Sequence, residues 1–255
     1  MRKSLKRAAR RHRASDCGHL DGPLVADAIL PRLPYLRRLI ENHFPTRRDA
    51  VILDLGCGWG PLVYVAAASG YTRIRGVDQS PQQVALASEL GIENVEEGAL
   101  QEVLASQESG SVDSAVMFDV IEHVARGELL AICAEVLRVL KPGGRWIIHT
   151  CNAGSPFFGA VRYGDLTHEL AFTDSSITRL LLTSGFCNVR CLEDRPVLRG
   201  AKSAVRRALW TLVRALLRLY DLVETGASSK DSILSRNFLV VAAKPGESAA
   251  PKVVG

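Results

Sequence analysis

The stretch VILDLGCGWG (residues 51–60) decides the fold. Its first half reads as a buried strand, and the glycine-rich turn that follows lets the backbone pass close to a ligand before a helix begins. A hydrophobic strand that runs into such a turn is typical of the first unit of a parallel sheet, where ligands bind at the carboxyl ends of the strands. Candidate functional residues are therefore expected just after each strand.

Short runs rich in β-branched residues recur along the rest of the chain and alternate with helical patterns. The predicted strands cover residues 51–55, 73–78, 94–98, 112–118, 145–150, 187–192 and 237–244, and the first five are separated by predicted helices over 60–69, 81–90, 100–107 and 126–140. This alternation predicts an α/β fold with a doubly wound, seven-stranded, mostly parallel sheet. We expect one domain over 23–244, between a basic flexible tail (1–22) and a short flexible tail (245–255).

The composition is that of an ordinary globular chain, with 255 residues of which 47% are hydrophobic and 23% charged. Residues 1–13 hold seven Lys or Arg and no acid, so the net charge of +5 lies in this tail and the body is close to neutral. A nucleic-acid partner is therefore not expected, and the tail either solubilises the chain or contacts phosphates or an anionic membrane. Six cysteines without a CxxC pair favour a reduced, cytoplasmic setting, and no stretch is long enough for a membrane span.

An acid stands at the end of the second predicted strand, Asp78 in GVDQS (76–80). A carboxylate there can accept both hydrogen bonds of a ribose diol, so the glycine turn and Asp78 together predict an adenosine-containing cofactor. Pro61 occupies the third glycine position of the dinucleotide fingerprint and offers no N–H to a pyrophosphate. This disfavours an NAD-dependent oxidoreductase. A simple strand-to-helix connection remains the alternative for a glycine turn taken alone.

Four successive segments, VILDLGCGWG, GVDQS, VMFDVIEHV (116–124) and EVLRVLKPGG (135–144), resemble in order and spacing the motifs of class I S-adenosylmethionine-dependent methyltransferases. The resemblance implies a methyl-transferring enzyme with S-adenosylmethionine as cofactor, although some chains of this fold keep the pocket as non-catalytic binding or scaffold proteins. It also implies a set of cofactor-binding residues: Asp54, Gly56, Cys57 and Gly58 beside the methionine part, Asp78 on the ribose, Asp119 at the edge of the site, and Gln79, Ala99 and Leu100 near the adenine.

The segment VMFDVIEHV contains three potential metal ligands, Asp119, Glu122 and His123. Some ubiquinone-pathway and RNA-end O-methyltransferases with a similar segment carry an acid, a Glu and a His there as magnesium ligands, so the resemblance implies a possible magnesium site. Magnesium prefers oxygen ligands, which argues against the histidine. The alternative is that Glu122 and His123 cap the following helix and line the pocket.

A second histidine segment, Asp165-Leu-Thr-His168-Glu169, follows an aromatic and glycine-rich loop (154–165) that reads as a mobile lid. We interpret His168 as a candidate general base for a hydroxyl acceptor, polarised by Asp165 or Glu169, and His123 as a further catalytic candidate. The alternative is a loop histidine that only hydrogen-bonds the acceptor or the backbone. The Asn-Pro-Pro-aromatic signature of DNA and amide N-methyltransferases is not found at 118–121, where the sequence is FDVI.

An insertion over 194–236 separates the last two predicted strands, which members of the family usually join by a short hairpin. Residues 202–224 within it predict an amphipathic basic helix. Its apolar residues are Val205, Leu209, Leu212, Val213, Leu216, Leu219, Tyr220 and Val223, and Lys202, Arg206, Arg214 and Arg218 are expected on the opposite face. Such a helix packs on the core, forms a homodimer face, or lies in the plane of a membrane.

The acceptor is not determined by these motifs alone. The segment THELAFTDSSITRLLLTSGF (167–186), followed by the amphipathic helix, resembles methyltransferases of bacterial cell-surface polysaccharide and lipopolysaccharide assembly. This resemblance implies a sugar hydroxyl on a lipid carrier as acceptor, and a membrane-associated protein. A quinone-like phenol or another small molecule remains open.

Overall fold

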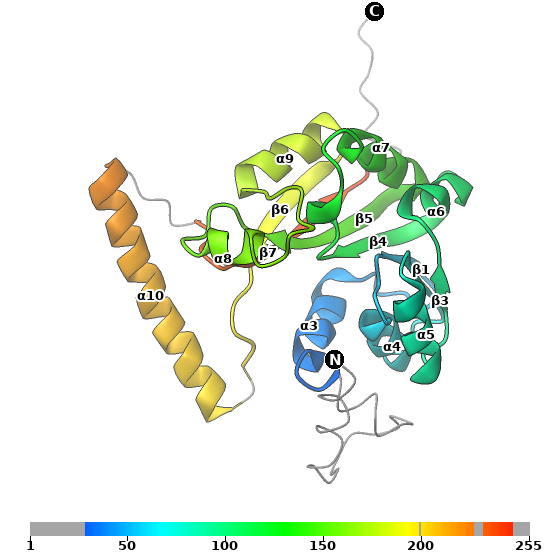
Figure 1. Ribbon diagram of the computed structural model, residues 1–255, viewed down its shortest axis with the longest axis horizontal. Coiled ribbons are helices and arrows are strands. Elements are labelled where there is room, and N and C mark those ends of the chain that lie inside the picture. The colour runs from blue at the N-terminus through cyan, green and yellow to red at the C-terminus, as the bar shows by residue number, and fades with distance from the viewer. Residues whose placement is uncertain (1–28, 199, 227–231, 247–255) are drawn as a thin grey trace, which may run out of the picture.

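The computed structural model describes residues 29–198, 200–226 and 232–246. The predicted basic tail (1–22) and residues 247–255 of the predicted C-terminal tail lie outside these ranges. A seven-stranded sheet in the order β3-β2-β1-β4-β5-β7-β6 forms the centre of the molecule (Figure 1). The pairs among β1 to β5 are parallel, and β7 runs antiparallel between β5 and β6. The predicted α/β class with a doubly wound, mostly parallel sheet is confirmed.

Every predicted strand is present within the described residues. The strands are β1 (Val51–Leu55), β2 (Arg73–Asp78), β3 (Val95–Glu97), β4 (Val112–Phe118), β5 (Leu140–Cys151), β6 (Cys187–Glu193) and β7 (Asn237–Ala243). Strand β5 begins earlier than predicted, because Leu140 already pairs with Val112 of β4 before a bulge interrupts the register. The preceding helix therefore ends at Val139 and not at residue 140.

The helices surround the sheet. They are α3 (Leu33–His43), α4 (Pro61–Ala68), α5 (Pro81–Glu89), α6 (Leu100–Ser106), α7 (Leu129–Val139), α8 (Phe158–Arg162), α9 (Asp174–Thr183) and α10 (Ala201–Thr225), with a short 3-10 turn η1 (Ile121–His123). The sequence patterns predicted α4 to α7 and α10 but not α3, α8 or α9. Helix α9 begins at a capping box in which the Thr173 hydroxyl accepts from the Ser176 N–H at 3.1 Å.

Two hydrophobic clusters fill the two faces of the sheet. Helices α3, α4 and α5 pack on one face, and α6, α7 and α9 pack on the other (Figure 1). Because both faces are covered, the central strands place apolar residues on both: Val116 and Ile147 are buried on one face, and Met117 and Ile148 on the other. The carboxyl ends of β1, β2, β4 and β5 meet at one edge, where the loops are free to form a site.

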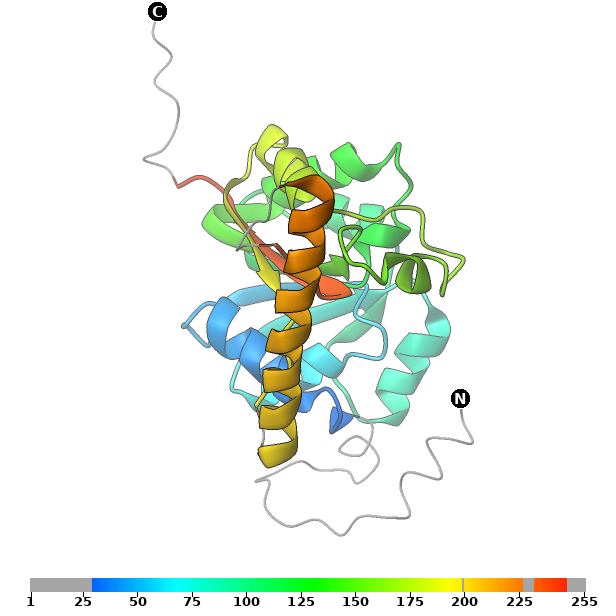
Figure 2. The ribbon, with the colours of Figure 1, turned by 90° about the vertical axis from the view of Figure 1, so that its left-hand side faces the viewer.

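Helix α10 stands beside the body as a separate rod (Figure 1), and Figure 2 shows it crossing in front of the sheet and its helices. It ends at Gly226, whose φ of 73° gives the left-handed cap that glycine favours. Its large apolar side chains are exposed, so the alternative of a helix packed on the core by its apolar face is wrong. None of the helices that the structure describes is both long and apolar enough to cross a membrane.

Candidate active site

A cavity of about 290 Å³ lies at the carboxyl ends of β1 and β2. Its wall includes Asp54, Gly56, Cys57, Gly58, Asp78 and Asp119 from the set of predicted cofactor-binding residues, together with Arg32, Leu36, Trp59, Pro61, Leu62, Gln83 and Phe118. The first strand, the glycine turn and the acid that ends the second strand thus face one space. This is the position in which an open α/β sheet binds a nucleotide.

The glycine turn is held against the second strand. The N–H groups of Gly56 and Cys57 both donate to the Val77 carbonyl, at 2.8 and 3.0 Å. Gly56 has a φ of 73° and Gly58 a φ of 58°, in the left-handed region that disfavours side chains. A Cβ atom at Gly56 would also collide with the Val120 side chain. The turn therefore needs glycine at position 56 for two separate reasons.

Asp78 is fixed in orientation by the same turn. Its Oδ2 atom accepts a hydrogen bond from the Gly58 N–H at 2.7 Å, and its Oδ1 atom accepts one from the Ser80 N–H at 2.9 Å. Each carboxylate oxygen has a second lone pair, so both can still accept a hydroxyl. The geometry is suited to a ribose diol.

Two further acceptors in the cavity have no hydrogen-bond partner among the described residues, Asp54 Oδ1 and Gln83 Oε1. A buried acceptor without a donor is costly, so the cavity lacks donors that a bound ligand would supply. Burial, together with the negative charge of Asp78, raises the pKa of Asp54 to about 7. These residues fit a cofactor that carries hydroxyl groups and a positive charge.

The adenine end of the site differs from expectation. Gln79, Ala99 and Leu100 do not line the cavity: Gln79 is exposed, Ala99 precedes α6, and the Leu100 side chain packs against the core. Gln83, on the first turns of α5, lines the cavity in their place. Adenine binding by Gln79, Ala99 and Leu100 stays a prediction.

The predicted magnesium ligands need correction. Among the described residues, the group that could hold a metal ion consists of Glu122, His123 and His168, whose ligand atoms lie within 4.8 Å of one another. Asp119 is not a member of this group, and its Oδ1 atom lies 2.5 Å from His149 Nδ1. Two imidazoles and one carboxylate do not fit magnesium, which prefers oxygen ligands.

Backbone hydrogen bonds bring the two histidines together. The Glu122 carbonyl accepts from the N–H groups of Glu169 and Leu170 at 2.8 and 2.9 Å, which anchors the loop after α8 to η1. The rings of His123 and His168 then meet edge to face, with centroids 4.7 Å apart. The Nδ1 atom of His168 is buried without a hydrogen-bond partner among the described residues.

The hydrogen-bond directions assign the proton on His123. The Thr167 hydroxyl donates to Asp165 Oδ1 at 2.7 Å, so its oxygen is free to accept from His123 Nδ1 at 3.0 Å. With Nδ1 as donor, the Nε2 atom of a neutral His123 keeps its lone pair and can accept a proton. Asp165 thus acts on His123 through Thr167. Polarisation of His168 by Asp165 or Glu169 stays a prediction.

Glu122 supports this group from within the protein. Its side chain is buried and its Oε2 atom accepts a hydrogen bond from the Thr150 hydroxyl at 2.9 Å. Burial raises the pKa of Glu122, and the nearby charge of Asp119 adds to the effect. The hydrogen bond from Thr150 therefore accounts for the position of Glu122 without a bound metal.

A buried network next to the cavity was not predicted. His149 of β5 lies between two carboxylates, with Nδ1 2.5 Å from Asp119 and Nε2 2.9 Å from Asp194, and the Tyr35 hydroxyl donates to Asp194 at 2.9 Å. The His149 ring also stacks on Phe118, with centroids 4.2 Å apart. Although burial lowers the pKa of His149, the hydrogen bonds and charges of the two carboxylates outweigh it and raise the pKa to about 10. The network holds Asp119 at the cavity edge.

The charged His149 predicts a pH-dependent stability. In the native state His149 keeps its proton up to about pH 10, whereas in the unfolded state it releases the proton above about pH 6.5. The contribution of His149 to the free energy of unfolding is therefore complete below about pH 6.5 and is lost as the pH rises toward 10. We expect the free energy of unfolding to fall by up to about 1.4 kcal/mol per pH unit in this window, relative to a His149→Gln variant. Urea unfolding of both proteins from about pH 7 to about pH 10 measures it. Parallel curves would contradict a charged His149.

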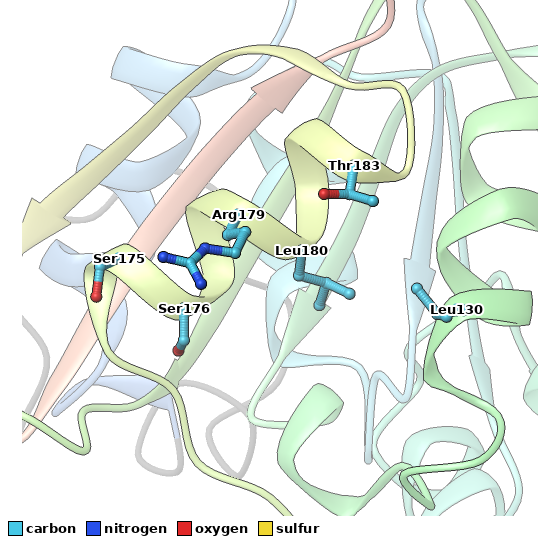
Figure 3. Close-up of a pocket in the computed structure, with 6 residues that line it drawn as sticks. All are labelled: Leu130, Ser175, Ser176, Arg179, Leu180 and Thr183. Atoms are coloured by element: carbon cyan, nitrogen blue, oxygen red, sulfur yellow. The ribbon is translucent and has the colours of Figure 1, made fainter.

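A shallower hollow of about 410 Å³ lies between α7 and α9 (Figure 3). Its wall consists of Leu130, Ser175, Ser176, Arg179, Leu180 and Thr183. The Leu180 side chain of α9 points toward Leu130 on α7 (Figure 3). With Arg179 as its one titratable side chain, this hollow does not supply an acid and a base, and the catalytic group lies elsewhere.

A comparison with protein families supports the interpretation of this cavity as a cofactor site. Residues 52–144, from the first strand to the start of β5, match the family described as a methyltransferase domain. This match agrees with the resemblance of the motifs to class I S-adenosylmethionine-dependent methyltransferases. The methyltransferase domain contains the glycine turn, Asp78 and the segment with Glu122 and His123. The family and cofactor implied by the sequence motifs are thereby confirmed, and the NAD alternative is not supported.

Curated relatives are O-methyltransferases in name. The chain is 37% identical over 106 residues to the ubiquinone biosynthesis O-methyltransferase of Caulobacter sp. (strain K31), and this match covers 40% of this chain and 40% of the relative. The corresponding protein of Maricaulis maris is 32% identical over 143 residues, or 52% of this chain and 55% of the relative. The chain thus spans about half the length of the curated relatives it matches.

Solved structures extend the similarity of fold to most of the chain. A S-adenosylmethionine-dependent methyltransferase from Archaeoglobus fulgidus superposes with a TM-score of 0.65 over 85% of this chain and 94% of that protein, at 18% sequence identity. At this identity the similarity establishes the fold alone.

Proposed function

We propose that the protein transfers a methyl group from S-adenosylmethionine to a hydroxyl group. The observation that carries the proposal is the contact between His123, which stands four residues after the cavity residue Asp119, and His168. Relatives named as O-methyltransferases of ubiquinone biosynthesis support oxygen as the accepting atom. When bound, S-adenosylmethionine supplies a methyl group on a positively charged sulfur, which is already activated for displacement.

The residues of this chain then have three tasks. Asp54 and Asp78 hold the cofactor through its cationic part and its ribose, and the glycine turn lets the backbone approach it. The Nε2 atom of His123 accepts the proton of the acceptor hydroxyl, and the Thr167 hydroxyl keeps the ring in the required tautomer. Positioning of the acceptor supplies the remainder of the rate.

The ionisation of Asp54 predicts a pH-dependent cofactor affinity. With a pKa of about 7, the carboxyl group of Asp54 is largely protonated at pH 6, and it must lose this proton when a cationic ligand binds. Between about pH 6 and about pH 7.5 we expect the affinity for S-adenosylhomocysteine, which keeps the ammonium group, to rise about five- to tenfold. Calorimetry measures this change. An Asp54→Asn variant should bind more weakly and show no such rise, and an equal rise in both proteins would assign the titration to another group.

The acceptor class is tested by label transfer. Cell extract incubated with the protein and methyl-labelled S-adenosylmethionine is separated into lipid, polysaccharide, small-molecule, protein and RNA fractions. We propose a sugar, lipid-linked glycan or small-molecule hydroxyl as acceptor, so label should enter one of the first three fractions and be stable as an ether. Label found only in protein or RNA would overturn this substrate class. Cofactor binding without label in any fraction would indicate a non-catalytic binding protein of the same fold.

A further inference from the structure

Helix α10 is oriented with its apolar side away from the protein. Its large apolar side chains are between 39% and 78% exposed, namely Val205, Leu209, Leu212, Val213, Leu216, Leu219, Tyr220, Leu222 and Val223. The residues of lowest exposure, Arg207, Trp210, Arg214 and Leu217, recur three to four positions apart on the opposite side. An amphipathic helix of a globular protein normally buries its apolar stripe, so α10 has the reverse orientation.

Contacts of the inner face hold this orientation. The Arg214 side chain is 8% exposed, forms an ion pair with Glu193 at the end of β6 and donates to the Ser232 carbonyl at 3.3 Å. Glu193 in turn accepts from the Leu234 N–H at 3.1 Å, just before β7. The ion pair between Arg214 and Glu193 therefore fixes α10 to the edge of the sheet. Rotating the helix to bury its apolar side would break the ion pair between Glu193 and Arg214 and leave Arg214 unpaired.

A cationic cavity lies between α10 and the body. This cavity of about 650 Å³ is lined by Arg38, Arg190, Arg195, Arg207 and Arg214, with Glu193 as its one acid. Glu193 pairs with Arg195 and Arg214, whereas Arg38, Arg190 and Arg207 form no ion pair within the described part of the chain. Burial lowers the pKa of His43 in the same wall, and the charges of Arg145, Arg190 and Arg38 lower it further. The cavity is therefore a region of positive potential.

Two more cations border the exposed apolar side. Lys202 and Arg206 are exposed and stand three residues before Val205 and Leu209, so each shares a face with its apolar neighbour. The sequence had placed both on the side opposite the apolar residues. Only Arg214 and Arg218 of that predicted set lie on the inner side.

We infer that α10 docks the protein on an anionic phospholipid surface, with its outward apolar side among the acyl chains and the arginine cavity behind it at the level of the lipid phosphates. Guanidinium groups pair well with phosphate, and an in-plane helix combines apolar burial with such attraction. The helix lies on the bilayer and does not cross it, in line with the lack of a membrane-spanning helix among the described residues.

A second copy of the chain is the competing occupant. Leu209, Leu212, Leu216 and Leu219 alternate at spacings of three and four, as in the seam of a coiled coil. Two observations favour lipid. The exposed apolar surface extends beyond that seam to Val213, Tyr220 and Leu222, where a coiled coil usually carries charged residues. Lipid phosphates would neutralise the arginines behind the helix that form no ion pair. A second copy packed on the apolar side would leave these arginines without an anionic partner.

Vesicle sedimentation of the full chain tests the inference without any assay of methyl transfer, so it is independent of the proposed function. We expect the protein to sediment with vesicles of phosphatidylglycerol and phosphatidylcholine in equal parts, and much less with phosphatidylcholine alone. A Leu212→Glu/Leu216→Glu variant should lose at least about tenfold in partition coefficient. A Leu130→Glu/Leu182→Glu variant introduces the same charges at exposed leucines of α7 and α9 and should bind as the wild type does.

A separate variant tests the contribution of the arginine cavity to vesicle binding. An Arg38→Gln/Arg207→Gln variant should lose part of the binding to anionic vesicles and show a weaker salt dependence, because fewer charges face the lipid phosphates. Sizing by light scattering is run on every variant, with circular dichroism to verify the fold. A wild-type protein that does not sediment, or a Leu212→Glu/Leu216→Glu variant that sediments equally, would overturn the inference. A wild-type dimer that this variant dissociates, with no vesicle binding, would assign the surface to a second copy.

Discussion

A His123→Ala variant is expected to lose about 10²- to 10⁴-fold in turnover while its affinity for S-adenosylhomocysteine stays unchanged. In the proposed reaction the Nε2 atom of His123 takes the proton of the acceptor, which is a contribution made only in the transition state. The proposed cofactor site is the separate cavity around Asp54 and Asp78. Turnover is measured with labelled cofactor and the acceptor fraction identified by label transfer, and affinity is measured by calorimetry.

A His168→Ala variant separates the two imidazoles. If His123 is the base, the loss in His168→Ala should be smaller, because His168 then contributes packing at 4.7 Å between ring centroids but no proton transfer. A larger loss in His168→Ala would restore His168 as the base. Treatment with a chelator should leave the rate unchanged. Loss of activity that added magnesium restores would instead assign the role of Glu122, His123 and His168 to a bound cation.

A Gly56→Ala variant is expected to abolish measurable cofactor binding and to destabilise the protein. The new Cβ atom would meet the Val120 side chain, and an alanine at φ 73° carries a strain of about 1–2 kcal/mol. Displacement of the turn to relieve the contact adds about 1–3 kcal/mol, the usual cost of overpacking. Calorimetry and urea unfolding give the two readouts.

The chain offers a matched control for this variant. Gly91 has a φ of 69°, and a Cβ atom there would meet nothing within 4 Å. Gly91→Ala should therefore show the left-handed strain alone, with cofactor affinity unchanged. A Gly56→Ala/Val120→Ala double variant should recover part of the binding. If Gly56→Ala were no worse than Gly91→Ala in stability and bound cofactor normally, the close approach of the turn to Val120 would not matter.

Much of the fold could be predicted because it depends on local patterns. Strands buried on both faces appear as continuous apolar runs, and helices α4 and α5 begin at prolines directly after the turn and after Ser80. Helix α3 was not predicted, although its buried residues Leu33, Leu36, Leu39 and Ile40 recur at helical spacing. The length of β5 depends on pairing of Leu140 with Val112, which no local pattern shows.

The candidate site could be predicted only where its residues lie near one another in sequence. Asp54, Gly58 and Asp78 follow from motif spacing. The contact of His123 with His168 depends on backbone hydrogen bonds from Glu169 and Leu170 to Glu122, more than forty residues earlier in the chain. The one sequence signal for the Asp119, His149 and Asp194 network was a histidine inside the apolar strand β5, and a single histidine does not identify its partners.

The reversed orientation of α10 also lies beyond sequence analysis. The periodicity of residues 202–224 correctly indicates an amphipathic helix of nearly the observed length. Which side faces the body depends on Glu193, a residue of β6 that pairs with Arg214 across the insertion. Apolar periodicity alone assumes that the apolar side is buried, and here the ion pair reverses that assumption.

Titration calorimetry with S-adenosylhomocysteine tests the central claim most directly, because both methyl transfer and the role of the cavity depend on cofactor binding. The account predicts one site per chain in the wild-type protein. It also predicts an affinity lower by about 1.5–3 kcal/mol in Asp78→Ala, the scale of hydrogen bonds to a charged group. A Glu89→Ala variant, which removes an exposed acid at the end of α5, should bind normally. No heat of binding in the wild type, or equal affinity in Asp78→Ala, would contradict the account.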